Sequence, residues 1–186
     1  EDALGQVYVK DLTMVPVKSA DDALQVVRRG FALRATHETA MNAVSSRSHT
    51  IFTIHVLQRD KNTGEATQGM LHMVDLAGSE RLRRSHSEGD RRAEALSINT
   101  SLTALGKVVM TLHKSTLQPT PDPSSHTHIP YRDAKLTRIL QNSLGGNSFL
   151  ALISTIHPRS EDAEESLSTL LFAHRCRFVP NRPRVK

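Results

Sequence analysis

The sequence predicts one α/β domain with a mixed central sheet flanked by helices. Three observations support this prediction. Some segments alternate apolar and polar residues with a period of two, as strands do, and others repeat apolar residues every three or four positions, as helices do. The two kinds of segment alternate along the chain, without an internal repeat or a domain boundary. A hydrophobic content of 38% over 186 residues is sufficient for one sizeable core.

The first elements are a short strand, a helix and a hairpin. Apolar residues between 7 and 12 indicate the strand. Residues 20–36 have helical periodicity, and Ser19 can cap this helix at its N-terminus. Alternation around residues 52–56 and an apolar run over residues 70–76 predict two strands. Asn-Thr-Gly lies between them and favours a turn, so the strands are expected to pair as a hairpin.

The second half of the chain predicts three helices and a strand. A long helix is expected near residues 92–114. A shorter helix is expected from Asp133 to the Gly-Gly pair that follows it. The near-continuous apolar run 149–156 is typical of a buried strand. The last helix is expected over 161–178, with acidic residues at its start and arginines at its end, as the helix dipole favours.

Composition narrows the function classes. The net charge of +5 suggests an acidic partner, which could be nucleic acid, an anionic membrane or a protein surface. Aromatic residues make up only 4%, which argues against a base-stacking surface, and no nucleic-acid recognition motif is present. No apolar run reaches the ~18 residues of a membrane helix. Cys176 is the only cysteine, so we expect a reducing compartment and a half-buried helical thiol.

One motif follows the second strand of the predicted hairpin. In LHMVDLAGSE, Asp75 ends the strand and is followed by Gly78 and Glu80. A carboxylate at a strand end can hold Mg²⁺ directly or through water, as in nucleoside triphosphatases. A glycine at this place lets a backbone N–H approach a γ-phosphate without a side-chain clash. By itself, Asp-x-x-Gly also occurs at ordinary turns.

The second motif is NAVSSRSH, residues 42–49, which comes just before the hairpin. Its adjacent hydroxyls, Ser45 and Ser46, could complete a Mg²⁺ shell and position an attacking water. A serine-rich loop alone would carry little weight. The two motifs together resemble the switch I and switch II pair of the kinesins.

Further segments extend the resemblance to nearly the whole chain. INTSLTALGKVV resembles the kinesin relay helix, IPYRDAKLTRILQNSLGGNS the microtubule-facing loop and helix, and ESLSTLLFAHRCRFV the last motor helix. The resemblance implies a partial kinesin-type P-loop NTPase motor fold over residues 1–186. It divides the chain into switch I near 42–49, switch II near 75–80, a relay helix near 92–114, a last helix near 161–178 and the start of a neck linker near 180–186.

The resemblance also implies that the protein uses ATP and Mg²⁺, and it implies which residues form their site. Ser46 and Asp75 would hold Mg²⁺, the latter through water, and Arg47 and Glu80 would form a salt bridge that closes the site. Asn99 would help to hold switch II. The implied catalytic residues are Asn42, Ser45, Ser46, Arg47, Gly78 and Glu80, and those for the nucleotide are Ser45, Ser46, Asp75 and Gly78.

The implied partners are microtubules and ATP or ADP, with no nucleic acid and no membrane insertion. This places the protein in the cytoplasm on the microtubule cytoskeleton, with cilium and spindle both open. Subfamily, direction, cargo and oligomeric state are not encoded in these residues. The implied microtubule-binding residues are basic: Arg81, Arg83, Arg84, Arg91, Arg132, Lys135 and Arg138.

The phosphate-binding loop GxxxxGK[ST] of such motors does not occur in these 186 residues. We therefore expect the chain to be part of a larger motor domain and to be inactive alone, with apolar edges left uncovered. Two function classes remain. The first is an ATP-driven microtubule motor, represented by a fragment, and the second is a non-catalytic kinesin-like microtubule-binding module. The intact set of switch residues favours the first.

Overall fold

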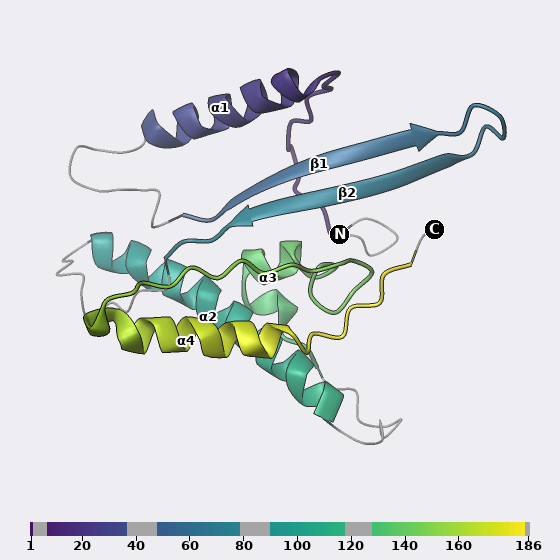
Figure 1. Cartoon of the computed structure of the whole chain (residues 1–186). Coiled ribbons are helices and arrows are strands. Elements are labelled where there is room, and N and C mark those ends of the chain that lie inside the picture. The colour runs from purple at the N-terminus through teal and green to yellow at the C-terminus, as the bar shows by residue number, and fades with distance from the viewer. Residues whose placement is uncertain (2–6, 37–47, 79–89, 118–127, 185–186) are drawn as a thin grey trace. The chain divides into compact units, whose positions relative to one another are not determined.

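The structure is a computed structural model, and it describes all but five segments of the chain. Side chains within 34–36 and 90–99 are also not described. The chain divides into two compact units: Asp11–Gly78 forms one, and Glu1–Lys10 with Ser79–Val185 forms the other. Figure 1 labels the helices and strands. The segments outside the description are 2–6, 37–47, 79–89, 118–127 and 185–186.

The unit Asp11–Gly78 begins with helix α1, Ala20–Thr36, which has the bounds predicted from the sequence. Its N-terminus is a reciprocal cap. The backbone N–H of Asp22 donates to Ser19 Oγ at 3.1 Å, and the N–H of Ser19 donates to the Asp22 carboxylate at 3.0 Å. Hydrogen bonds from the Lys18 backbone and the Ser19 hydroxyl lower the pKa of Asp22, so this carboxylate stays charged at the positive end of the helix dipole.

The predicted hairpin is confirmed. Strand β1, Thr50–Arg59, pairs antiparallel with β2, Ala66–Asp75. The turn between them is held by Asp60, whose carboxylate accepts the backbone N–H groups of Asn62 at 2.7 Å and Thr63 at 2.9 Å. The register places Thr50 opposite Asp75, so the residues before β1 and after β2 emerge at the same end of the hairpin.

The other unit is built around α2, Asp90–Leu117, the long helix that the sequence predicted. Its buried side chains pack against 3₁₀ helix η3, Tyr131–Asp133, against α3, Lys135–Ile139, and against the turn after α3. Thr137 is fully buried, and its hydroxyl lies 2.7 Å from the carbonyl oxygen of Tyr131 and 2.9 Å from that of Ala134. The apolar core of this unit comprises Ala104, Leu105, Val108, Val109, Leu112, Leu136, Leu140 and Leu144.

The last helix begins with a 3₁₀ turn, η4, Ser160–Asp162, and continues as α4, Ala163–Cys176. It packs against α2, which it crosses in the view of Figure 1. Cys176 lies in the last turn and is half-buried, as predicted, and burial raises the pKa of its thiol to about 11. The thiol is therefore protonated at neutral pH and unreactive.

Two predicted strands do not form, and both predictions are wrong for the same reason. Residues 7–9 and 149–156 have no strand pairing, and the side chains of Phe149 and Ile153 are 90% and 91% exposed. A strand forms only where a neighbour takes its backbone hydrogen bonds. Among the described residues, β1 and β2 pair only with each other, so the predicted central sheet is represented by the hairpin.

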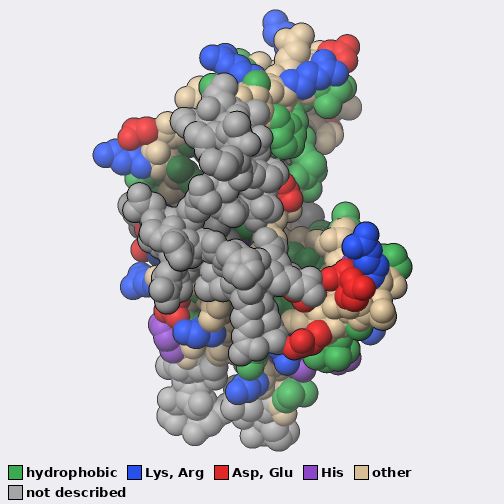
Figure 2. Space-filling view, turned by 90° about the vertical axis from the view of Figure 1, so that its left-hand side faces the viewer, with side chains coloured by type: hydrophobic (Ala, Val, Ile, Leu, Met, Phe, Trp, Pro, Cys, Tyr) green, Lys and Arg blue, Asp and Glu red, His purple; other side chains and the backbone are tan. Residues whose placement is uncertain are grey.

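Apolar side chains consequently reach the surface in both units. Met70 and Leu71 of β2 are each 53% exposed. Hydrophobic side chains are visible among charged ones on the face drawn in Figure 2. Uncovered apolar surface was expected for part of a larger domain. None of the described helices combines the length and apolar character required to cross a membrane.

Candidate functional site

The two predicted switch segments meet at the open end of the hairpin. His49, the last residue of NAVSSRSH, directly precedes β1, and Leu76 directly follows β2. Because Thr50 and Asp75 are paired across the hairpin, both segments leave it side by side. The Asp75 side chain is exposed at this end. An exposed carboxylate at a strand end is an oxygen donor of the kind that Mg²⁺ prefers.

A hydrogen bond connects the two segments directly. The backbone N–H of Ala77 donates to Nδ1 of His49 at 3.0 Å, and Ala77 is only 4% exposed. Burial lowers the pKa of His49, against the opposing effect of the Asp75 charge. A ring nitrogen that accepts an N–H carries no proton, so this geometry requires the neutral imidazole with its proton on Nε2. His49 therefore fixes the backbone immediately before Gly78.

Only part of the predicted nucleotide site lies in the described chain. Asp75 and Gly78 are described, and the hairpin places them next to the end of the serine-rich segment. Five predicted residues lie outside the described residues, so their contacts remain predictions: Asn42, Ser45, Ser46, Arg47 and Glu80. Asn99 lies in α2, but its side chain is not described. Across the described residues, no three His, Cys, Asp or Glu side chains form a cluster suited to a metal ion.

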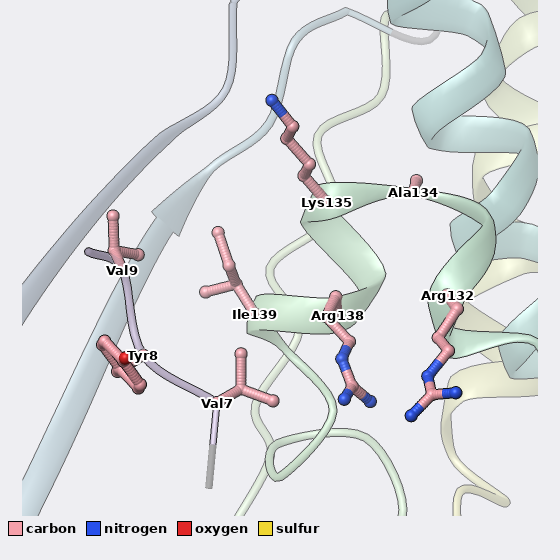
Figure 3. A pocket seen from close by; sticks show the side chains of 8 residues that line it. All are labelled: Val7, Tyr8, Val9, Arg132, Ala134, Lys135, Arg138 and Ile139. Carbon is pink, nitrogen blue, oxygen red and sulfur yellow. The ribbon is translucent and has the colours of Figure 1, made fainter. Parts of the chain in front are cut away.

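The predicted microtubule-binding residues that the structure describes are Arg132 of η3 and Lys135 and Arg138 of α3. They line a cavity of about 420 Å³, shown in Figure 3, together with Val7–Val9, Ala134 and Ile139. In this view the guanidinium groups of Arg132 and Arg138 point the same way, and Lys135 points away from them. Arg81, Arg83 and Arg84 lie outside the described residues, as does the side chain of Arg91.

These three cations differ in exposure. The side chain of Arg132 is 75% exposed and that of Arg138 is 21% exposed, and Lys135 is exposed. Both arginines pair with the Glu1 carboxylate, and Arg132 does so at 3.5 Å. Arg138 also donates to Gln141 Oε1 at 2.5 Å. Arg132 and Lys135 can therefore meet a partner directly, whereas Arg138 is engaged within the unit.

One contact, made by Asn181, was not predicted from the sequence. Its Oδ1 accepts the backbone N–H of Gly145 at 2.6 Å, and its Nδ2 donates to the carbonyl of Ser143 at 3.0 Å and reaches Ser148 Oγ at 3.4 Å. The next residue, Arg182, donates its N–H to the Gly146 carbonyl at 2.9 Å. The segment after α4 is thus attached to the turn after α3. No local motif marks this contact, because its two halves are far apart in the sequence.

The turn that receives Asn181 requires its glycine pair. Gly145 has φ of +87°, and a Cβ there would lie 2.9 Å from Leu112 Cδ2 and 3.1 Å from the Tyr131 hydroxyl. A Cβ on Gly146 would lie 2.5 Å from the Asn142 carbonyl oxygen. The Tyr131 hydroxyl donates to the Leu144 carbonyl, and burial raises its pKa. The turn is thus packed closely against α2.

Comparison with known proteins gives the family. The sequence profile of the kinesin motor domain matches residues 1–179. Kinesin-like protein 3 of Schizosaccharomyces pombe is 46% identical over 182 residues, which cover 98% of this chain and 31% of that protein. A kinesin heavy chain of Botryotinia fuckeliana is 48% identical over 179 residues, which cover 96% of this chain and 19% of that protein.

Solved structures agree. A fast kinesin superposes with a TM-score of 0.84 at 45% identity, covering 100% of this chain and 50% of that chain. A KIF14 dimer, in a two-heads-bound state with AMP-PNP on a microtubule, superposes with a TM-score of 0.82 at 39% identity. The match covers 96% of this chain and 49% of that chain. The chain thus spans about half of these motor chains. Because the profile and both superpositions extend over nearly all of its residues, the chain belongs to the kinesin motor domain family.

Proposed function

We propose that this chain is the part of an ATP-driven microtubule motor that senses the nucleotide and provides part of the track-binding surface. One observation carries the proposal. The hydrogen bond between Ala77 and His49 joins the two segments that the sequence assigns to the switches. Relatives at 46–48% identity are named kinesins, and a similar structure was solved with AMP-PNP and a microtubule, which supports ATP and microtubules as the partners.

In this proposal the switch residues act by position and charge. Asn42 and Ser45 orient the attacking water near the γ-phosphate, and the Gly78 N–H contacts that phosphate. Ser46 directly, and Asp75 through water, would hold Mg²⁺, which when bound neutralises charge on the phosphates. Arg47 and Glu80 close the site when the γ-phosphate is present. His49 keeps the backbone before Gly78 in place.

Hydrolysis also requires a phosphate loop, whose backbone amides and lysine hold the phosphates. The 186 residues contain no GxxxxGK[ST] sequence. We therefore infer that turnover arises in a complete motor domain and that this chain alone does not hydrolyse ATP. Microtubule-stimulated, Mg²⁺-dependent ATPase activity in the purified chain would contradict this inference.

The track-binding surface is basic. Tubulin is acidic, so exposed cations such as Arg132 and Lys135 provide complementary charge and salt-dependent binding. Arg81, Arg83, Arg84 and Arg91 would extend this surface beside switch II, and Arg138 would support it from within. Because Arg81 directly follows Glu80, binding to the track would bias the backbone that senses the γ-phosphate. By linkage, nucleotide and track change each other's affinity equally, and displacement of α2 would transmit the change to the segment after α4.

The experiment that tests the proposal is Glu80→Ala in the complete motor domain. Loss of a group needed only for closure should lower the microtubule-stimulated kcat by about a hundredfold or more, while nucleotide binding, held by the phosphate loop, stays near normal. Glu65→Ala, at an exposed position beside the hairpin turn, makes the same charge change and serves as the control. Near-normal turnover in Glu80→Ala would refute the assigned role.

The second candidate, a non-catalytic microtubule-binding module, predicts a different outcome. The complete protein would then cosediment with microtubules in a salt-dependent manner and show no ATPase activity. Replacing Arg132 and Lys135 by Ala should weaken cosedimentation and flatten its salt dependence under either candidate. Unchanged affinity in that variant would place the track contact elsewhere.

A further inference from the structure

Three aromatic rings join α2 to the end of α4. The ring of Phe178, just after α4, stacks on the imidazole of His113 in α2, with centroids 4.8 Å apart and planes at 11°. His174, in the last turn of α4, meets the same ring edge-on at 5.3 Å and 73°. Both geometries lie in the range in which aromatic pairs attract. Phe178 is therefore in contact with both helices at once.

Phe178 lies where the chain leaves α4. Its backbone N–H donates to the Arg175 carbonyl at 3.2 Å, and the N–H of Val179 donates to the Cys176 carbonyl at 3.2 Å. Both are 3₁₀-type hydrogen bonds, to the carbonyl three residues earlier, and they end the helix. Only two residues separate Phe178 from Asn181, whose amide is bonded to Gly145. The Phe178 ring thus holds the start of the segment that follows α4, which we call the outgoing segment, and Asn181 holds the same segment three residues later.

Two consecutive residues of α2 contact both of these points. His113 touches Phe178 directly. Leu112 is buried, and its Cδ2 lies 2.9 Å from where a Cβ on Gly145 would be. Leu112 therefore packs against the glycine whose N–H is held by Asn181. A rotation or shift of α2 moves Leu112 and His113 together, so both supports of the outgoing segment respond to the position of one helix.

We propose that His113 is a positioning residue that couples the position of α2 to the order of the segment beginning at Phe178. The inference rests on the proposed function, in which the nucleotide displaces α2. Attraction between rings is confined to centroid separations below ~7 Å, so a modest displacement of α2 removes the stacking partner of Phe178. The outgoing segment is ordered while α2 holds the observed position and is released when α2 moves.

The test uses the complete motor domain with a nitroxide label at position 182, introduced as Arg182→Cys. His113→Ala should lower the ratio of immobile to mobile label about fivefold, which is the change expected from losing the free energy that a typical aromatic pair contributes. His113→Phe retains a stackable ring and should restore the ratio. Lys114→Ala, at the next and exposed position of α2, is the matched control and should leave the ratio unchanged.

A second measurement separates coupling from simple stability. In His113→Ala the gliding velocity on microtubules should fall by a larger factor than kcat, while the KM for ATP stays the same, and His113→Phe should recover the velocity. An unchanged label ratio in His113→Ala, or failure of His113→Phe to restore it, would overturn the inference. A complete domain without ATPase activity would instead refute the proposed function, and the label ratio would still decide whether His113 orders the segment.

Discussion

Replacing Asn181 by Ala should release the segment after α4 from the turn after α3. The substitution removes the acceptor of the Gly145 N–H, at 2.6 Å, and the donor to the Ser143 carbonyl, at 3.0 Å. The third contact, to Ser148 Oγ at 3.4 Å, is too long to add much. Each of the two good bonds contributes about 0.5–1.5 kcal/mol net, so the loss is ~1–3 kcal/mol.

The assay is hydrogen exchange of the Gly145 amide in the complete motor domain. Since 1.4 kcal/mol is tenfold in an equilibrium constant, its protection factor should fall by about 5- to 150-fold. The amide of Val108, in the buried middle of α2, is the internal reference and should keep its protection. A parallel fall at Val108 would instead indicate global destabilisation.

Asn181→Asp separates the two halves of the contact. The Asp side chain keeps an oxygen that can accept the Gly145 N–H but loses the donor to Ser143. Protection at Gly145 should therefore remain within about threefold of the parent. If Asn181→Ala leaves the exchange of Gly145 unchanged, Asn181 does not hold this turn, and the reasoning from the hydrogen-bond geometry is refuted.

Three further predictions concern a glycine, a histidine and the cysteine. Gly145→Ala should lower the free energy of unfolding by ~2–4 kcal/mol, since strain at φ +87° adds to the clash with Leu112. Gly64 has φ of +75° with open space around it, so Gly64→Ala should lower the free energy of unfolding by only the backbone strain, ~1–2 kcal/mol. If denaturant titrations gave equal losses for the two variants, the clash of a Cβ at position 145 with Leu112 would be contradicted. Because the folded state lowers the pKa of His49, the unfolded chain binds more protons. The contribution of His49 to stability is thus present above its ordinary pKa of ~6.5 and lost as pH falls through the lower folded value. The protection factor of the Ala77 amide should fall over the same range, and a pH-independent value would count against the contact with His49. With the pKa of Cys176 at about 11, alkylation in the folded chain should be about a hundredfold slower than in the unfolded chain, and equal rates would show an exposed thiol.

The sequence by itself determined the elements whose stabilising contacts are local. The start of α1 follows from Ser19 and Asp22, which cap it within four residues of each other. The hairpin follows from two alternating runs and from the turn that Asp60 organises. The two predicted switch motifs lie beside the hairpin strands, so pairing of Thr50 with Asp75 is enough to bring their ends together. Family membership was also readable, because the motifs occur in order along the chain.

Tertiary structure decided the features that depend on partners distant in the sequence. The apolar run 149–156 has the composition of a strand, but a strand needs a neighbour for its backbone groups, and in the described chain none pairs with it. Arg138 looks like an exposed cation in sequence, yet Glu1 and Gln141 engage it.

The contacts around the outgoing segment are the clearest case. Asn181 bonds to Gly145 across 36 positions, and His113 stacks on Phe178 from a different helix. Periodicity and capping signals extend over a few residues and cannot specify such pairs. These contacts arise because packing of α2 against α3 and α4 brings side chains from three segments to one place. Local sequence therefore determined the helices and the hairpin, whereas pairing and packing between distant segments decided whether other apolar runs form strands and which side chains meet.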